Sequence, residues 1–140
     1  MSTASILAAL ELRLATVTPN LATMREAMMF APVAGVPYQK VSLITAEPIN
    51  ASYGGADWRE EGFFQVMLCY PNQGATATGS GAARMQAERV RAVFARGTTL
   101  IFGTITVTIA RTPAVAPAFG DADRFCLPIR IRYFAHIRSP

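Results

Sequence analysis

The alternation of apolar and polar side chains over residues 100–111 constrains the fold of this chain more than any other feature. Threonines separate the apolar residues Ile105, Val107 and Ile109, so the two kinds of side chain fall on opposite sides of an extended backbone. This pattern is typical of a strand with one buried face. The chain must therefore supply other elements that cover one face of a sheet.

Three further segments show the same period and predict strands over residues 38–46, 63–70 and 125–135. In the last of these, Pro128 lies on the face opposite the apolar residues. Because proline has no backbone N–H, we expect this strand to lie at a sheet edge or to be bulged. The inward side chains of the two later segments are Phe64, Val66, Leu68, Tyr70, Phe125, Leu127, Ile129, Ile131 and Tyr133.

Two segments show helical spacing. Residues 3–15 repeat apolar side chains every three or four positions, and residues 82–96 do so again with a charged opposite face. Residues 21–30 fit a short helix or an edge strand equally well. The apolar stripes of the two helices are Ile6, Leu7, Leu10 and Leu14, and Ala83, Ala87, Val90 and Phe94.

The predicted order of elements is helix, strand, strand, helix, strand, strand. Two one-sided helices and four one-sided strands predict an α+β fold, a two-layer sandwich of about four mainly antiparallel strands with two helices packed on one face. A length of 140 residues predicts a single domain over residues 1–140. A chain of that size can fold without disulfides or a metal.

Two connections are long enough to be functional or mobile. Residues 49–62 hold Trp58, which either folds back onto the core or anchors a neighbouring subunit. Residues 74–81 have the glycine spacing of a phosphate-binding loop, but Ser80 stands where the lysine that reaches the phosphates is required. We therefore interpret this segment as a linker that ends in a helix cap, with nucleotide binding as the weaker hypothesis.

Charged residues make up 16% of the chain, against about 25% in an ordinary domain. The apolar surplus predicts either a large core or surface reserved for neighbouring subunits. The net charge of +4 includes 12 arginines and one lysine, spread along the chain rather than clustered in a stripe. This distribution argues against sequence-specific DNA binding and leaves only weak contact with passing DNA.

The sequence offers little catalytic chemistry, and we expect no enzyme activity, cofactor or metal. The single histidine, His136, lies four residues before the C-terminus, where chains are often loosely held, so it is a poor base for a nucleophile. Glu60 and Glu61 are interpreted as solvated loop acids. Cys69 and Cys126 lie far apart in apolar runs, so we expect buried, reduced thiols.

Arg130 and Arg132 lie on the polar face of the last predicted strand. They are either ordinary solvated charges or residues that face a ring lumen or a partner subunit. In the second case, Arg111 and Arg138 extend the same basic surface. Arginine and tryptophan are enriched at interface hot spots, so the candidate subunit-interface or lumen-facing residues are Arg130, Arg132, Trp58 and Arg111.

The N-terminus lacks a basic leader, and Glu11 and Arg13 interrupt its apolar stretch. No run approaches the roughly 18 apolar residues of a membrane span. We therefore expect a protein that stays in the cell that makes it and has no membrane partner.

Several soft motifs, apolar patterns marked by glycine and proline, follow one another along nearly the whole chain. After the end of the first helix at residues 14–16, they are GVPYQKV (35–41), EGFFQV (61–66), LCYP (68–71), AERVRAVF (87–94) with Arg96 and Gly97 behind it, and LPIRI (127–131). In this order they resemble the tail terminator-like minor tail proteins of long-tailed phages and their prophages.

The resemblance implies a structural role with no catalytic residues to carry over. Lambda-type tail terminators assemble as a ring on the growing tail tube, stop its polymerisation and present a surface to head-side connector proteins. For this chain the resemblance implies a homo-oligomeric ring, non-specific passage of DNA, and a place in the host cytoplasm during assembly and then in the virion tail. Another neck, head-closure or minor tail component is the alternative within the same class.

Overall fold

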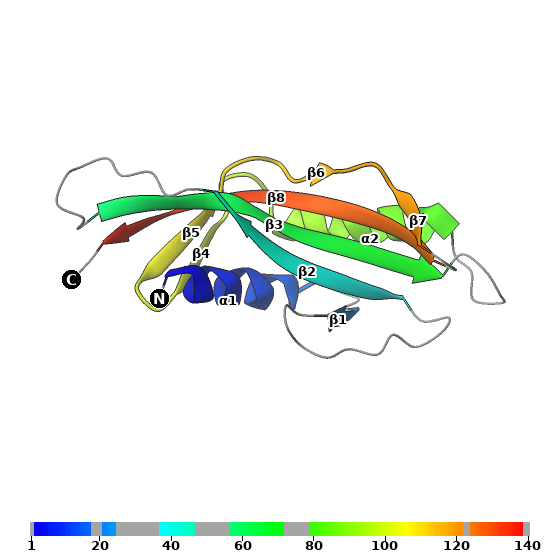
Figure 1. The fold of residues 1–140 in the computed structure, drawn as a ribbon, viewed down its shortest axis with the longest axis horizontal. Helices are drawn as coiled ribbons and strands as arrows, with labels where there is room; N and C mark the ends of the chain where they lie inside the picture. Colours follow the sequence, from blue (N-terminus) through cyan, green and yellow to red (C-terminus); the bar gives the residue numbers. More distant parts are fainter. Residues whose placement is uncertain are drawn as a thin grey trace.

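A single sheet dominates the computed structural model, which describes residues 2–17, 21–24, 37–46, 57–71, 79–121 and 124–138. Two helices accompany the eight strands of this described part (Figure 1). In chain order the elements are α1 (Ser2–Leu14), β1 (Ala22–Met24), β2 (Tyr38–Thr45), β3 (Asp57–Pro71), α2 (Gly79–Val93), β4 (Thr99–Phe102), β5 (Ile105–Ile109), β6 (Ala114–Val115), β7 (Phe119–Asp121) and β8 (Arg124–Arg138).

Strands β3 and β8 form the centre of the sheet and pair antiparallel along all 15 residues of each. From one edge to the other the order is β1-β2-β3-β8-β5-β4. Strands β5, β6 and β7 follow one another along the edge of β8 that faces away from β3. The sheet is open and strongly curled, like half of a barrel (Figure 1).

This curled sheet shows that the predicted two-layer sandwich of about four strands is wrong. The sequence pattern identifies the segments of β2, β3 and β8, but residues 100–111, predicted as one strand, form the two paired strands β4 and β5 with a turn at Gly103 between them. It misses β6 and β7, and for residues 21–30, which contain the edge strand β1, it leaves a short helix and an edge strand as equal alternatives. Strands of two or three residues are too short to show a period of two. The curl has no signature in the alternation either, because it arises from twist that accumulates along neighbouring strands.

Strand β3 begins at Asp57, so the last part of the predicted connection 49–62 is strand rather than loop. Trp58 and Glu60 continue the row of Phe64 on the face toward the helices. The carboxylate of Glu60 breaks the apolar pattern of that row and hides the extension. Its burial is compensated by Trp58, whose Nε1–H donates to Oε1 of Glu60 at 2.8 Å.

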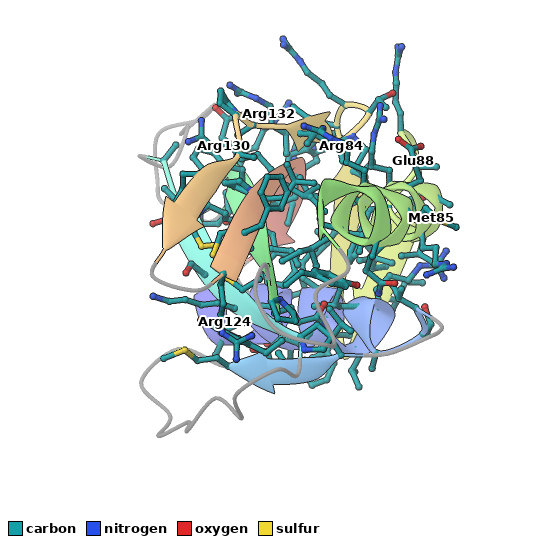
Figure 2. All side chains as sticks on the ribbon, turned by 90° about the vertical axis from the view of Figure 1, so that its right-hand side faces the viewer. Arg84, Met85, Glu88, Arg124, Arg130 and Arg132 are labelled. Atoms are coloured by element: carbon teal, nitrogen blue, oxygen red, sulfur yellow. The ribbon has the colours of Figure 1, made fainter. Side chains whose placement is uncertain are left out.

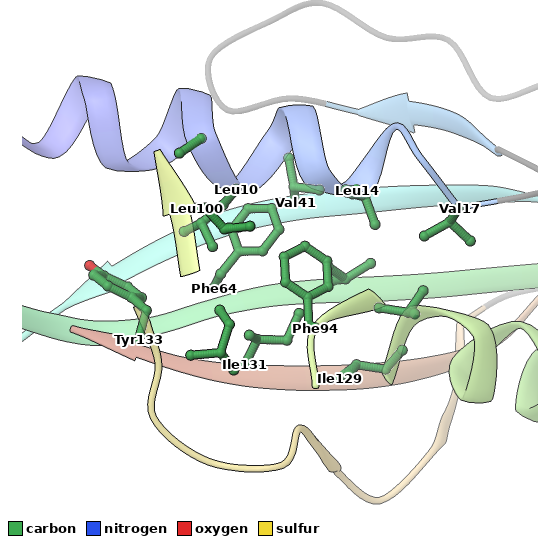
Figure 3. Close-up of a cluster of buried hydrophobic side chains, with 14 of the residues drawn as sticks. Leu10, Leu14, Val17, Val41, Phe64, Phe94, Leu100, Ile129, Ile131 and Tyr133 are labelled. Atoms are coloured by element: carbon green, nitrogen blue, oxygen red, sulfur yellow. The ribbon is translucent and has the colours of Figure 1, made fainter. Parts of the chain in front are cut away.

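The apolar core lies between the inner face of the sheet and the two helices (Figure 3). Phe64 of β3 and Phe94, just after α2, meet there with ring centroids 6.2 Å apart and planes tilted by 50°. The predicted apolar stripes of both helices are confirmed, since their members are buried except for the half-buried Leu7. Helix α1 packs against β4 and β5, and α2 packs against β3 and β8.

Pro128 lies inside the sheet rather than at a sheet edge, because β8 has β3 on one side and β5, β6 and β7 on the other. The N–H of Ala116 donates to the carbonyl oxygen of Pro128 at 2.9 Å, so the carbonyl of Pro128 points toward β6. In a strand, the N–H and C=O of one residue point to the same side. The missing N–H of Pro128 therefore removes no hydrogen bond from the ladder between β3 and β8.

Gly62 lies where the backbone of β2 leaves no room for a side chain on β3. A Cβ at this position would overlap the carbonyl oxygen of Ile44 and lie 3.0 Å from the Cα of Thr45. Both neighbours are backbone atoms of the paired strand, which cannot rotate out of the way as a side chain can. The pairing of β2 with β3 at this point therefore requires a glycine.

We predict that Gly62→Ala lowers the free energy of unfolding by about 1–3 kcal/mol, the usual cost of extra volume in a packed site. The matched control is Gly81→Ala in α2, where an added Cβ meets no atom within 4 Å. The control should leave stability unchanged or raise it by up to about 1 kcal/mol, because alanine favours a helix. Chemical unfolding of both variants measures the difference, and equal stabilities would contradict the role of Gly62.

Candidate assembly surface

Arg130 and Arg132 project from the outer face of β8, the face opposite the helices (Figure 2). The alternation that buries Ile129 and Ile131 leaves both arginines exposed to solvent. Across the ladder, Arg132 lies opposite Phe63 of β3. The two arginines therefore share one face with the outward side chains of β3.

Two arginine side chains of this outer face lie over aromatic rings of the sheet. The guanidinium carbon of Arg130 lies 5.5 Å from the ring centroid of Phe63, and that of Arg59 lies 4.2 Å from the ring centroid of Phe134. Such contacts are attractive because the face of an aromatic ring carries negative charge density. They also restrict the side chains before a partner arrives, which lowers the entropy lost on binding.

An open cleft of about 390 Å³ lies on this part of the surface, and two of the predicted arginines, Arg111 and Arg132, line it. The end of β2, the middle of β3, β8 and the segment after β5 all contribute to its walls. Arg59 and Glu61 of β3 also line it, with Nε of Arg59 3.4 Å from Oε2 of Glu61. Three arginines face one carboxylate, so we call this site the basic cleft.

The basic cleft combines an unsatisfied donor with apolar walls. The Nε atom of Arg59 is buried and has no hydrogen-bond acceptor among the described residues, although the carboxylate of Glu61 is near. Buried donors are normally paired, so the contact between Arg59 and Glu61 is an ion pair without a well-formed hydrogen bond through Nε. Phe63 forms part of the wall, and Ile44, which is 42% exposed, lies beside it.

Trp58 lies on the opposite face of β3, away from the outward row of Arg59 and Glu61. Its ring packs half-buried against the core, and its Nε1–H is already bonded to Glu60. Of the two predicted alternatives, this geometry is that of a ring folded back onto the core. The side chain of Arg138, a predicted extension of the basic surface, lies outside the described part of the chain.

Strand β4 presents a second exposed surface at an edge of the sheet. Within the described ranges it pairs only with β5, so its outer edge has no strand partner there. Ile101 is 74% exposed and Phe102 is 38% exposed, next to the turn at Gly103. Natural proteins usually cover or charge such edges, because bare edges pair with other chains. We call residues 99–102 the β4 edge.

A family model described as a phage tail terminator protein matches residues 5–133. The chain belongs to this family. A solved protein structure is similar to this terminator with a TM-score of 0.75 and 24% sequence identity, and the match covers 96% of each chain. That likeness concerns the fold alone. No curated protein matches the sequence.

Membership of the family confirms the resemblance found in the sequence motifs. It makes the terminator a structural protein of the phage tail that contacts other tail or virion components. A structural family also agrees with the expectation that the chain is not an enzyme.

The structure also bears on the other sequence predictions, which concern the glycine-rich loop, a metal site, a membrane span and the two cysteines. Most of residues 74–81, the loop considered for nucleotide binding, lies outside the described residues. Where the chain is described, no three or more His, Cys, Asp or Glu side chains gather as a metal site. None of the described helices is long and apolar enough to cross a membrane. Cys69 and Cys126 are buried and are not joined in a disulfide, as predicted.

The sequence pattern did not reveal that Arg59, Glu61 and Phe63 line the cleft, because residues 59–61 were expected in a loop. The usable signal is the period of β3 itself. Extending it backward from Gln65 places these three residues in one outward row.

Tyr133 forms part of the cleft wall, but its side chain is buried and its hydroxyl has no hydrogen-bond partner among the described residues. Burial, and to a smaller extent the charge of Glu60, raises the pKa of Tyr133 to about 12. Burial is also the main cause that raises the pKa of Tyr38 to about 12. Unfolded phenols ionise near pH 10, so the native protein holds more protons than the unfolded chain from about pH 10 to 12, and stability falls across that range.

We predict that Tyr133→Phe raises the free energy of unfolding at neutral pH by about 1 kcal/mol, because it removes a buried hydroxyl without a partner. Between pH 10 and 12 the variant should lose less stability than the original protein, since phenylalanine cannot ionise. Urea unfolding at a series of pH values measures both effects. A less stable variant at neutral pH would contradict the assignment of an unpaired hydroxyl.

Proposed function

We propose that the terminator closes into a ring that caps the tail tube, ends its polymerisation and offers a joining surface to the head-side connector. Two unlike exposed surfaces on one chain support this proposal, the basic cleft and the β4 edge. A ring of identical subunits needs heterologous contacts, in which one surface of each copy meets a different surface of the next. This pair of surfaces is the observation that carries the proposed function.

In the proposed ring, the β4 edge of one copy contacts the basic cleft of the next. The edge offers backbone carbonyl groups, and the guanidinium groups of Arg111 and Arg132 each carry several donors in a fixed plane. Ile44 and Phe63 offer apolar surface to Ile101 of the neighbouring copy. Such a contact buries the apolar side chains that the isolated chain exposes at its edge.

A protein neighbour fits the basic cleft better than DNA does. Glu61 lies among its arginines and repels phosphate, and its apolar walls gain nothing from a sugar-phosphate backbone. Arg130, outside the cleft on the same face, extends the contact in this proposal. Trp58 supports β3 from the inner side. Passage of DNA through the ring involves no sequence readout and needs no dedicated site.

We predict that Ile101→Asp and Arg132→Glu each abolish the ring, measured by light scattering over a range of protein concentrations. Each variant keeps one intact surface, so an equimolar mixture should form a two-chain species that neither variant forms alone. The matched controls are Met85→Asp and Arg84→Glu, because both residues are exposed on α2 and lie outside the two surfaces (Figure 2). The controls should assemble like the original chain.

The same experiment shows whether Arg130 and Arg132 lie in the contact between subunits or face the lumen of the ring. If Arg130 and Arg132 face the lumen, Arg132→Glu assembles a normal ring but weakens salt-dependent retention of DNA. That result would overturn the contact proposed for the basic cleft and leave the ring itself in place. A chain that stays monomeric at every concentration, with and without tail tubes, would overturn the ring.

We predict that a phage carrying an amber mutation in this protein makes overlong tails, because nothing stops the growing tube. Supplying the original chain or Arg84→Glu should restore normal tail length, and Ile101→Asp and Arg132→Glu should not. Electron microscopy of the particles measures tail length directly. Tails of normal length in the mutant would contradict the capping role and favour another neck or minor tail component.

A further inference from the structure

The two cysteines of the chain, far apart in the sequence, lie directly opposite each other on β3 and β8. Cys69 and Cys126 are partners in the ladder, with their sulfur atoms 2.7 Å apart. The two residues are only 2% and 1% exposed. Both stand in the outward rows of their strands, on the same side of the sheet as Arg130, rather than in the core between sheet and helices. The chain contains no other cysteine.

The backbone at this pair is also suited to a covalent link. The carbonyl of Pro128 points toward β6 and away from β3, and Cys126 lies two residues away in the same orientation. Cys126 and Cys69 therefore form a non-hydrogen-bonded pair, in which Cα atoms are about 4.5 Å apart. That separation falls within the range of about 4.4–6.8 Å that a disulfide spans.

The cross-strand neighbours of the thiols on this outward face are Tyr38 of β2, opposite Cys69, and Phe119 of β7, opposite Cys126. The phenol of Tyr38 shares a hydrogen bond with the Cys69 thiol. The guanidinium carbon of Arg124 lies 4.8 Å from the ring centroid of Tyr38. Because the thiols lie outside the core between the sheet and the helices, an oxidant need not cross that core to reach them.

We propose that Cys69 and Cys126 are the reduced form of an intrachain disulfide that closes when a peroxide oxidises the native protein. One thiolate attacks hydrogen peroxide, which breaks the O–O bond, releases hydroxide and leaves a sulfenic acid on sulfur. The second thiol then attacks that sulfur, the S–S bond forms and hydroxide leaves. In sum, two thiols and one hydrogen peroxide give one disulfide and two molecules of water, so the sulfurs are oxidised and the peroxide is reduced.

The link would join the two longest strands of the sheet between positions 57 residues apart in sequence. A disulfide that closes a loop of this length restricts the unfolded chain and stabilises the folded one when its geometry is unstrained. Such bonds persist outside the reducing interior of cells. That the disulfide stabilises phage particles outside the cell rests on the proposed function in the virion tail. Formation of the disulfide in the purified chain does not depend on that function.

The test uses the purified full chain, reduced and then treated with stoichiometric hydrogen peroxide under native conditions. We expect both thiols to be lost in a titration after denaturation, an intact mass lower by two hydrogens, and a non-reducing peptide map that links the segments of Cys69 and Cys126. The melting temperature of the oxidised protein should rise by about 10 °C. Dithiothreitol should reverse all these changes.

The single variants Cys69→Ala and Cys126→Ala are the controls, and peroxide should raise the melting temperature of neither. If a variant fails to fold, the original chain still decides the question, since its two cysteines permit only one intrachain bond. Two titratable thiols after peroxide treatment of the folded protein would overturn the proposal. Disulfides found only between chains, or a lower melting temperature of the oxidised protein, would overturn it as well. Ring assembly is measured separately, so these outcomes are distinguishable from failure of the proposed function.

Discussion

The antiparallel ladder between β3 and β8 is the interaction on which the rest of the terminator depends. It pairs 15 residues of each strand and fixes, position by position, which side chains share a face. The inner rows pack against α2 and form the core together with the apolar side chains of α1, and the outer rows hold the basic cleft and the thiol pair. A slip of one residue in this ladder would exchange the core for the surface.

Local periodicity explains how much of the fold the sequence could predict. The apolar stripes of both helices and the alternation after Phe63 and over residues 105–109 are clear because each repeats several times, whereas the turn at Gly103 that divides residues 100–111 into two strands is not visible in the alternation. Glu60 shows the opposite case, since a single buried carboxylate hides the first part of β3 until its bond to Trp58 is known. The curl arises from twist that accumulates along paired strands, and β6 and β7 are too short to show a period of two, although β7 directly precedes its partner β8.

The candidate site could likewise be predicted only where it depends on alternation within one strand. That Arg130 and Arg132 share an outward face follows from alternation in one strand. That Arg111 joins Arg132 and Arg59 in one cleft follows from strand neighbours and from the course of the chain after β5, which alternation does not encode. Cys69 and Cys126 become partners only through the register of the two central strands.

The separation of inner and outer rows on β3 and β8 allows the two faces to diverge at different rates. Replacements in the inner row must fit the packed core, whereas replacements at exposed outward positions, such as Arg130 and Arg132, meet solvent or a neighbouring molecule. A lineage of such chains can therefore change its neighbours without rebuilding its core. A solved structure that shares 24% of the residues yet matches 96% of the chain shows how much sequence this fold can exchange.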